Sequence, residues 1–251
     1  VSENIFKEFD DIGYSGGHFV LNAKDFGIPQ NRKRAFFILF KGGKKRNEFR
    51  LKKIEEYLDG EMANSEKYLL KDALFGLRRL KAKTVKNRTD LESSEYGYRM
   101  EISKKFPQND FLKLINKSKT NGVIYNHLSR FNNTRDIEIF RLLPKGQNSL
   151  HQSIQHLMPY KTRNHIFKDK YFKLNPNKPS KTITAHMSYD CNMYIHPTQA
   201  RGLTPREAAR IQTFPDHFEF LGSYTKWYQQ IGNAVPPHLG MIVGKSIMKS
   251  I

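Results

Sequence analysis

Cysteine is nearly absent from this sequence: Cys191 is the only one among 251 residues. A single cysteine excludes a disulfide framework and any zinc site built from several cysteines. It is typical of proteins in a reducing compartment, so we predict a cytoplasmic location. Long apolar runs are absent too, since no stretch of about 18 apolar residues and no charged-then-apolar leader occurs. We therefore predict neither a membrane span nor a secretory signal.

Acidic residues are scarce relative to basic ones. The chain has 24 Asp and Glu against 43 Lys and Arg, which gives a formal net charge of +19. A field of this sign attracts polyanions, and counterions released from nucleic acid favour the complex. The composition thus favours nucleic-acid binding, with a non-specifically basic surface as the alternative. Because 38% of the residues are apolar, the chain can still bury a core.

The first 45 residues have the pattern of one helix followed by two strands. Apolar residues recur at helical spacing over residues 5–12, and Gly13 is suited to end that helix. The glycine pair at 16–17 predicts a turn. The apolar runs 19–21 and 35–40 predict strands, the second buried on both faces.

The middle of the chain is harder to interpret. Helices are predicted around 49–58 and 68–80, after which the periodicity weakens between residues 82 and 175. That stretch is polar and basic with scattered aromatics, a composition typical of irregular loops that contact a charged partner and stack on bases. A small satellite core is the alternative for most of these aromatics. The basic run 161–173 is open between DNA contact and a solvated face.

The last quarter is predicted to hold two strands, at 182–185 and 193–195, and two helices. A capping box with proline at the first helical position predicts a helix over 205–212. Two prolines open a final helix at residue 237. Its broad apolar stripe, within 239–251, requires an apolar surface on which to lie.

Three short segments contain more than a core requires. The first, residues 25–34, places Gln30, Arg32 and Arg34 just before a predicted strand. Alternation along a strand sends both arginines to one side, where two guanidiniums could clamp a phosphate or a base edge. The second segment is the capped helix with its flanks, residues 201–215. The third, residues 229–237, has a glycine at 232 that permits close backbone approach to a ligand at a helix entrance.

In this order the three segments resemble the C-terminal half of DNA (cytosine-5)-methyltransferases. The family's eighth, ninth and tenth motifs are matched by Gln30-Arg32-Arg34, by Arg201-Leu203-Thr204-Arg206-Glu207-Ala209-Arg210-Gln212-Phe214-Pro215 and by Gly232-Asn233-Ala234-Val235-Pro237. Asn22-Ala23 and the following Phe26-Gly27-Ile28-Pro29 also resemble the stretch before the eighth motif. The middle of the chain is similar in length and composition to the family's variable target-recognition region.

The resemblance implies an α/β fold. We expect the C-terminal part of a Rossmann-like methyltransferase domain, dependent on S-adenosylmethionine, plus a mixed, loop-rich target-recognition domain. Residues 1–45 would be the last strands of the catalytic domain. Residues 46–222 would be the recognition domain with its scaffold helix, and residues 223–251 would return to the catalytic domain.

The resemblance also implies the catalytic residues. In the family a cytosine is flipped out of the duplex before it is methylated. Arg34 would contact that cytosine, Arg32 would help to organise the site, and Gln30 would position the turn. The alternative is that both arginines only brace the strand.

For the cofactor, the resemblance implies that Asn233, Ala234 and Val235 complete the wall of an S-adenosylmethionine pocket. Contacts to base edges of double-stranded DNA would come from loops between about residues 82 and 180. No metal is predicted, because the histidine spacings match no metal site.

The family's nucleophile is a cysteine that precedes the eighth motif, together with a glutamate and a Gly-rich cofactor turn. These do not fit before Gln30, and nothing near Cys191 suggests a lowered pKa or a positioned base. The predicted function is therefore the DNA-recognition and cofactor-pocket-completing part of a cytosine-5 methyltransferase in a restriction-modification system. We expect a split-enzyme subunit or fragment, inactive alone, whose nucleophile lies on a partner chain, the N-terminal half of the enzyme, in a heterodimer.

Two other functions stay open. One is a non-enzymatic, sequence-specific DNA-binding protein derived from the same fold. The other is an unrelated basic RNA-binding protein, although no motif of such a module occurs.

Overall fold

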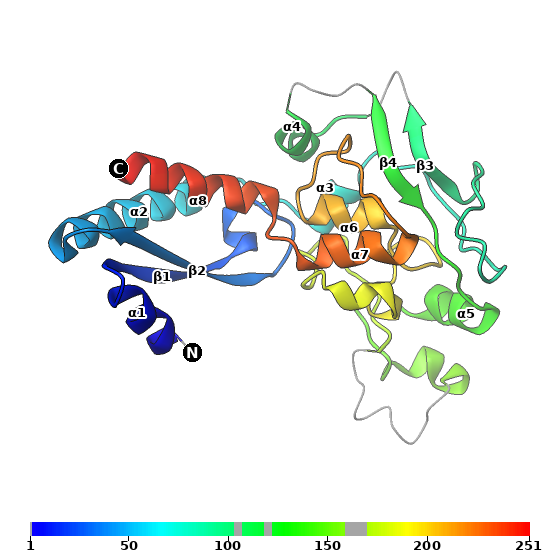
Figure 1. The fold of residues 1–251 in the computed structure, drawn as a ribbon. Helices are drawn as coiled ribbons and strands as arrows, with labels where there is room; N and C mark the ends of the chain where they lie inside the picture. The colour runs from blue at the N-terminus through cyan, green and yellow to red at the C-terminus, as the bar shows by residue number, and fades with distance from the viewer. Residues whose placement is uncertain (1, 103–106, 118–121, 159–169) are drawn as a thin grey trace.

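The computed structural model describes residues 2–102, 107–117, 122–158 and 170–251, which form two lobes (Figure 1). The first lobe holds α1 (Ser2–Asp10), β1 (Tyr14–Asn22), η1 (Ala23–Phe26), β2 (Lys33–Lys41), α2 (Lys44–Asn64) and α8 (Pro237–Ser250). The second holds α3 (Leu70–Leu74), β3 (Gly97–Ile102), α4 (Asp110–Asn116), β4 (Val123–Leu128), α5 (Thr134–Leu142), η2 (Gln152–Leu157), η4 (Ala185–Ser188), η5 (Asn192–Tyr194), α6 (Pro205–Ile211) and α7 (Tyr224–Asn233).

The core of the first lobe lies between a two-stranded sheet and a pair of helices. β1 and β2 pair antiparallel, from Tyr14 opposite Lys41 to Asn22 opposite Lys33. α2 and α8 pack against each other, so the part of the apolar stripe that holds Leu239, Ile242 and Val243 is buried, whereas Met248 and Ile251 stay exposed. The buried residues that meet here include Leu21, Ile38, Ile54, Leu58, Leu239 and Ile242.

Two predictions for the first lobe are wrong. β2 is not buried on both faces: Ile38 is its one fully buried residue, and Phe37 is 36% exposed. The face that bears Phe37 is covered only in part, by Phe6 of α1. The glycines at 16–17 are not a turn but lie inside β1, and the chain turns at Gly13, whose φ is 81°.

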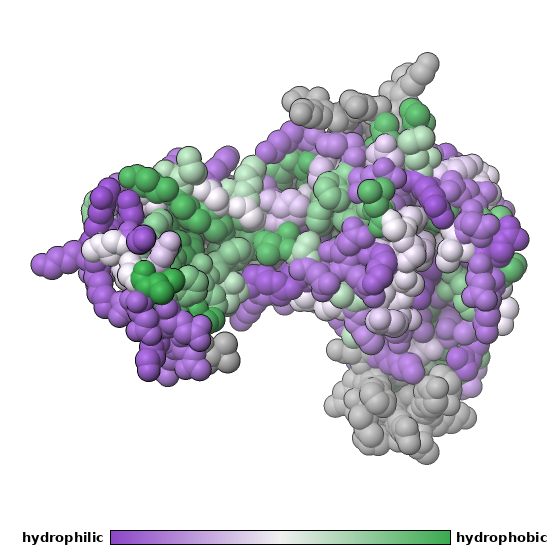
Figure 2. Space-filling model, viewed as in Figure 1, coloured by the Kyte–Doolittle hydropathy of each residue, from purple (hydrophilic) through white to green (hydrophobic). Residues whose placement is uncertain are grey.

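Apolar surface gathers over the first lobe, whereas the facing side of the second lobe is largely polar (Figure 2).

The second lobe is built around α6 and α7. β3 and β4, which α4 separates in the chain, pair antiparallel from Gly97 opposite Leu128 to Ile102 opposite Val123. α6 contacts β4, and α7 lies against η4. The larger core cluster includes Phe111, Ile183, Leu203, Ile211 and Tyr228, and a smaller one joins Ile139, Phe140 and Tyr171. The satellite-core alternative is therefore correct for Tyr171, whereas Phe111 belongs to the larger core.

The expectation of irregular structure between residues 82 and 175 is wrong in part, because β3, α4, β4 and α5 lie there. Both helices begin at asparagine caps: Asn109 Oδ1 accepts the Leu112 N–H and Asn133 Oδ1 accepts the Asp136 N–H, each at 2.8 Å. The elements are too short to produce a clear periodicity. Most of the basic run 161–173 lies outside the described residues.

The strands predicted at 182–185 and 193–195 do not form. Residues 182–184 are in no regular element, and Ala185 begins η4. Residues 193–194 belong to η5, and Ile195 makes isolated bridges to Lys173 and Gly202. Each segment meets a neighbour at single residues, so no ladder propagates. Of the predicted helices, those at 205 and 237 are confirmed, the one at 68–80 shrinks to α3, and α7 was missed.

The fold is mixed α/β, as predicted. The described residues form two two-stranded antiparallel sheets, so the Rossmann-like part of the prediction has no counterpart among them. The division at 1–45, 46–222 and 223–251 stays a prediction, although the boundary after residue 45 falls inside α2, which packs in the first lobe. Within the described ranges, no helix is long and apolar enough to cross a membrane.

Candidate active site at the lobe junction

The three segments that the sequence singled out meet where the two lobes join. Gln30 is fully buried; its Oε1 accepts the Ile183 N–H at 2.7 Å, and its Nε2 donates to Gln212 Oε1 at 3.1 Å. Gln212 Nε2 in turn donates to the Ile231 carbonyl at 2.6 Å. A chain of two buried amides thus links the first segment to the second and the second to the third.

Arg32 closes the triangle between the first and third segments. Its side chain is 0% exposed, and Nη2 donates to the carbonyls of Gly232 at 2.8 Å and Ala234 at 3.0 Å. Nη1 donates to the Ile183 carbonyl. Burial first, and then the charge of Arg34, lower the pKa of Arg32 to about 10, so the guanidinium stays protonated at neutral pH.

Arg34 has a different environment. It lies in β2 opposite Leu21, is half-buried, and donates from Nη1 to the Lys33 carbonyl at 3.0 Å. The two arginines therefore do not form the predicted clamp, because both Nη atoms of Arg32 are used on backbone carbonyls. Arg34 is the one of the pair that a ligand can reach. The individual roles of Gln30, Arg32 and Arg34 in catalysis stay predictions.

The glycine of the third segment makes a close approach, but to the protein itself. A Cβ at Gly232 would lie 2.1 Å from the Ala185 nitrogen, so only glycine lets the end of α7 meet the start of η4. Of the next three residues, Asn233 is exposed and Val235 is 41% exposed, whereas Ala234 is half-buried and packs against the larger core cluster. Because Arg32 holds the carbonyls of this segment, the side chains are available to line a pocket. Their role at a cofactor stays a prediction.

The second segment is a structural scaffold in which charged side chains pair with one another inside the second lobe. Thr204 and Glu207 form the predicted capping box, with Thr204 N–H donating to Glu207 Oε2 at 2.8 Å. Arg201 grips the same carboxylate through two bonds of 2.8 and 2.6 Å. Burial alone would raise the pKa of Glu207, but Arg201 and His196 hold it well below its usual range.

Two more buried arginines extend this scaffold. Arg210 binds Asp216 through Nε at 2.7 Å and Nη2 at 2.8 Å. Arg206 donates to three carbonyls, including that of Pro215 at 2.7 Å. Sequence reasoning placed these residues in a scaffold helix but gave no signal that all of them would be buried.

Cys191 has the surroundings of a structural residue. It is 2% exposed, its Sγ lies 3.6 Å from the Leu203 carbonyl oxygen, and burial raises the pKa of its thiol although Arg130 lies beside it. A buried thiol with a raised pKa is a poor nucleophile.

The part of the chain that the structure describes contains no group of three or more His, Cys, Asp or Glu that could hold a metal. His196 is buried instead, and its Nδ1 accepts the N–H groups of Thr198 and Gln199 at 3.1 Å.

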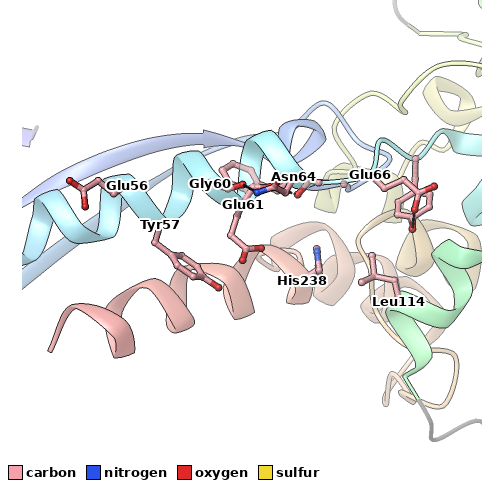
Figure 3. Close-up of a pocket in the computed structure, with 12 residues that line it drawn as sticks. Glu56, Tyr57, Gly60, Glu61, Asn64, Glu66, Leu114 and His238 are labelled. Atoms are coloured by element: carbon pink, nitrogen blue, oxygen red, sulfur yellow. Dashed lines mark hydrogen bonds between the residues drawn. The ribbon is translucent and has the colours of Figure 1, made fainter.

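A cavity of about 470 Å³ also lies near the junction, between α2 and the start of α8 (Figure 3). Tyr57 and Glu61 point into it from α2, and His238 faces them from α8. None of the predicted site residues lines it. The sequence gave no signal for this cavity, because its walls come from helices at opposite ends of the chain.

Residues 1–249 match the model of the C-5 cytosine-specific DNA methylase family. The chain belongs to this family. The Type II methyltransferase M.DdeI of Desulfomicrobium norvegicum is 31% identical to this methylase over 262 residues, which cover 98% of this chain and 57% of the relative. M.Bpa9945I of Bacillus paralicheniformis is 31% identical over 265 residues, with 98% and 56% covered. M.AgeI of Thalassovita gelatinovora is 46% identical over 85 residues, 34% of this chain and 20% of the relative.

A solved structure supports the same fold. It is described as a DNA modification methyltransferase encoded within a prophage, from E. coli, and it matches this methylase with a TM-score of 0.62 and 22% identity. The match covers 99% of this chain and 63% of that chain. At this level of identity the likeness establishes the fold alone.

These matches correct one prediction. The methylase was expected to be only the C-terminal half of an enzyme, as a split subunit or fragment, with the family resemblance confined to its two ends. That expectation is wrong, because the family model runs through residues 1–249 and the relatives align over 98% of the chain, middle included. The alignments give no support to a separate N-terminal-half partner. The chain spans little more than half the length of these relatives, 57% of M.DdeI and 56% of M.Bpa9945I.

Proposed function

We propose that this methylase takes part in the transfer of a methyl group from S-adenosylmethionine to C5 of a flipped cytosine in double-stranded DNA. It contributes a DNA-recognition surface and one wall of the cofactor pocket. Relatives at 31% identity are named Type II methyltransferases, which supports a role in restriction and modification. In this proposal the first lobe belongs to a Rossmann-like methyltransferase domain and the second reads the target sequence. A cytoplasmic location stays a prediction.

The observation that carries the proposal is the convergence of the three segments. Hydrogen bonds at the lobe junction join residues up to 202 positions apart, Arg32 and Ala234. Such a junction fixes Arg34 on one side and residues 233–235 on the other. Fixing catalytic and cofactor-binding groups in one geometry is how a protein lowers the entropic cost of a two-substrate reaction.

The residues at the predicted cofactor wall fit that ligand. Asn233 offers an exposed amide with donor and acceptor atoms, and Val235 offers exposed apolar surface. A nucleoside with an amino-acid tail requires both kinds of contact. When bound, S-adenosylmethionine supplies the activated methyl group, and this chain's residues bind and orient it.

Arg34 is assigned to the base. Its guanidinium is charged, partly accessible and held within β2, so it can donate paired hydrogen bonds to the polar edge of an extruded cytosine. Arg32 positions this strand and does not itself contact DNA, because it is fully buried.

Cys191 does not serve as the nucleophile in this proposal. It is buried and its pKa is raised, whereas attack on a pyrimidine requires an accessible thiolate. In this proposal the nucleophile is a group other than Cys191.

The test combines DNA binding and methyl transfer. The purified 251-residue chain should bind a duplex with an affinity that falls steeply with salt, because its charge displaces counterions. With labelled S-adenosylmethionine it should transfer no methyl group. Methyl transfer that disappears in a folded Cys191→Ser variant would overturn the assignment of Cys191, and salt-independent or absent DNA binding would overturn the recognition role.

A further inference from the structure

Tyr189 is a large aromatic side chain held out in solvent. Its exposure is 74%, although it directly follows η4, which is tightly packed. η4 buries Met187 and Ser188 in the second lobe and turns His186 outward. The segment therefore anchors itself with two residues and presents two rings, those of His186 and Tyr189, to the outside.

The backbone beneath Tyr189 is fixed at several points. The Met187 carbonyl accepts a hydrogen bond from half-buried Arg130 at 2.9 Å, and the Ile183 carbonyl accepts from Arg32. The Ala185 nitrogen approaches Gly232 so closely that a Cβ there would lie 2.1 Å away. Tyr189 N–H closes the turn by donating to the His186 carbonyl at 3.0 Å. Because this backbone segment is already fixed, binding through the Tyr189 ring costs little backbone entropy.

Polar side chains flank the ring. The His186 and Tyr189 ring centroids are 6.1 Å apart, and Gln229 Nε2 donates to the Tyr189 hydroxyl at 3.5 Å. Gln229 and Asn233 are four residues apart on α7, so they share one side of that helix. Tyr189 thus stands beside the predicted cofactor wall, at the junction of the lobes.

We infer that Tyr189, flanked by His186 and Gln229, is a stacking site for an unpaired DNA base. The inference rests on the proposed function, and it places a DNA contact outside the loops at 82–180 that the sequence favoured. The π face of tyrosine stacks on any base, while imidazole and amide groups reach the polar edges of a base. Polar neighbours around a lone exposed ring suit a nucleotide better than the apolar face of a protein partner. The net charge of +19 matches the polyanion that carries the base.

The test uses the full chain and two duplexes of equal length, one fully paired and one with a single unpaired base. Wild-type protein should bind the second duplex more tightly. Tyr189→Ala should weaken that binding about 5- to 100-fold, the range expected for loss of one base-aromatic stack, and should weaken binding to the paired duplex less. The dependence of affinity on salt should keep its slope, because no charge is removed.

Two variants make the result specific. Tyr189→Phe keeps the ring and should bind like wild type. Met248→Ala removes a side chain of equal exposure, 74%, from α8 in the first lobe and should leave both affinities unchanged. Thermal unfolding of each variant checks that it folds.

Equal effects of Tyr189→Ala and Met248→Ala on the unpaired-base duplex would overturn the inference while leaving the proposed function in place. A loss in Tyr189→Phe as large as in Tyr189→Ala would replace stacking with a hydroxyl contact and also overturn it. Failure of the wild-type chain to bind either duplex would instead show that the proposed function is wrong.

Discussion

Two regions of this methylase bury arginine side chains, and they balance the charge differently. Around α6, Arg201 and Arg210 each bind a carboxylate, of Glu207 and Asp216. Arg206 donates only to carbonyls, but the charge of Asp216 acts on it as well. At the lobe junction, the hydrogen-bond partners of Arg32 among the described residues are all carbonyls, and its Nε has no partner there. The charge that acts most strongly on the pKa of Arg32 is the like charge of Arg34.

This difference in charge balance indicates that the region around α6 is a structural scaffold and that the lobe junction is the candidate site. Charges around α6 are neutralised within the lobe, so that region gains rigidity from bonds that need nothing from outside. The junction keeps a net positive charge. A buried cation that only carbonyl dipoles stabilise is less completely compensated, and the place it supports is suited to an anionic partner such as DNA.

The substitution Glu207→Gln tests the scaffold and has the largest expected effect. Removing the carboxylate leaves Arg201 charged and buried without its partner, which should lower the free energy of unfolding by about 3–5 kcal/mol. Glu138→Gln removes one side of an exposed pair with Arg141 and should cost less than about 1 kcal/mol. Urea unfolding of both variants measures the difference. Equal losses of stability would contradict the claim that buried ion pairs around α6 stabilise the fold.

Arg32→Met tests the other region. The substitution keeps an extended side chain but leaves the carbonyls of Ile183, Gly232 and Ala234 without their donor. We expect a loss of about 2–4 kcal/mol in the free energy of unfolding, because buried unsatisfied acceptors are costly. Among the described residues the Arg34 guanidinium donates only to the Lys33 carbonyl, so Arg34→Met should cost under about 1 kcal/mol and serves as the control. If Arg32→Met is as mild as the control, Arg32 does not hold the segments together.

Acid should weaken the scaffold. Burial lowers the pKa of His127 to about 4 and that of His196 to about 3, from 6.5. Between these values and 6.5 the unfolded chain binds more protons than the folded one, so stability is complete above about pH 6.5 and falls as the pH falls through that window. Each histidine should contribute a loss of about 2 kcal/mol at pH 5.

The measurement is the urea midpoint at pH 7 and at pH 5. His127→Gln removes one of the two titrating histidines of the scaffold and should reduce the change between these pH values by about 2 kcal/mol, while His238 of α8, whose pKa burial also lowers, keeps contributing. An unchanged difference in that variant would place the acid sensitivity elsewhere.

What the sequence predicted well is what short stretches of chain determine by themselves. Thr204, Pro205 and Glu207 specify the start of α6 within four residues, and the capping box forms as expected. The prolines before α8 act in the same way. The family resemblance singled out Gln30, Arg32 and Gly232, which the structure brings together at the lobe junction, and their roles at the site stay predictions.

What the sequence could not predict depends on distant partners. Strand alternation placed Arg32 beside Arg34, yet its guanidinium turns toward carbonyls 151 to 202 residues away. Residues 182–185 have strand-forming side chains but meet no continuous neighbour, so no strand forms. The apolar stripe of α8 was predicted to require an apolar surface, but the sequence did not show that α2, which was assigned to the other domain, supplies part of it.

The central claim is that the joined segments form a methyl-transfer site for cytosine in DNA. The most direct test replaces the aligned segment of M.DdeI with residues 1–249 of this methylase and maps 5-methylcytosine in the DNA by bisulfite sequencing. We predict methylation, and in Arg34→Lys a loss of turnover worth about 1–3 kcal/mol with unchanged unfolding, because lysine cannot reproduce a bidentate contact. A chimera that folds and binds DNA but leaves cytosine unmodified, or one in which Arg34→Lys turns over normally, would contradict the claim.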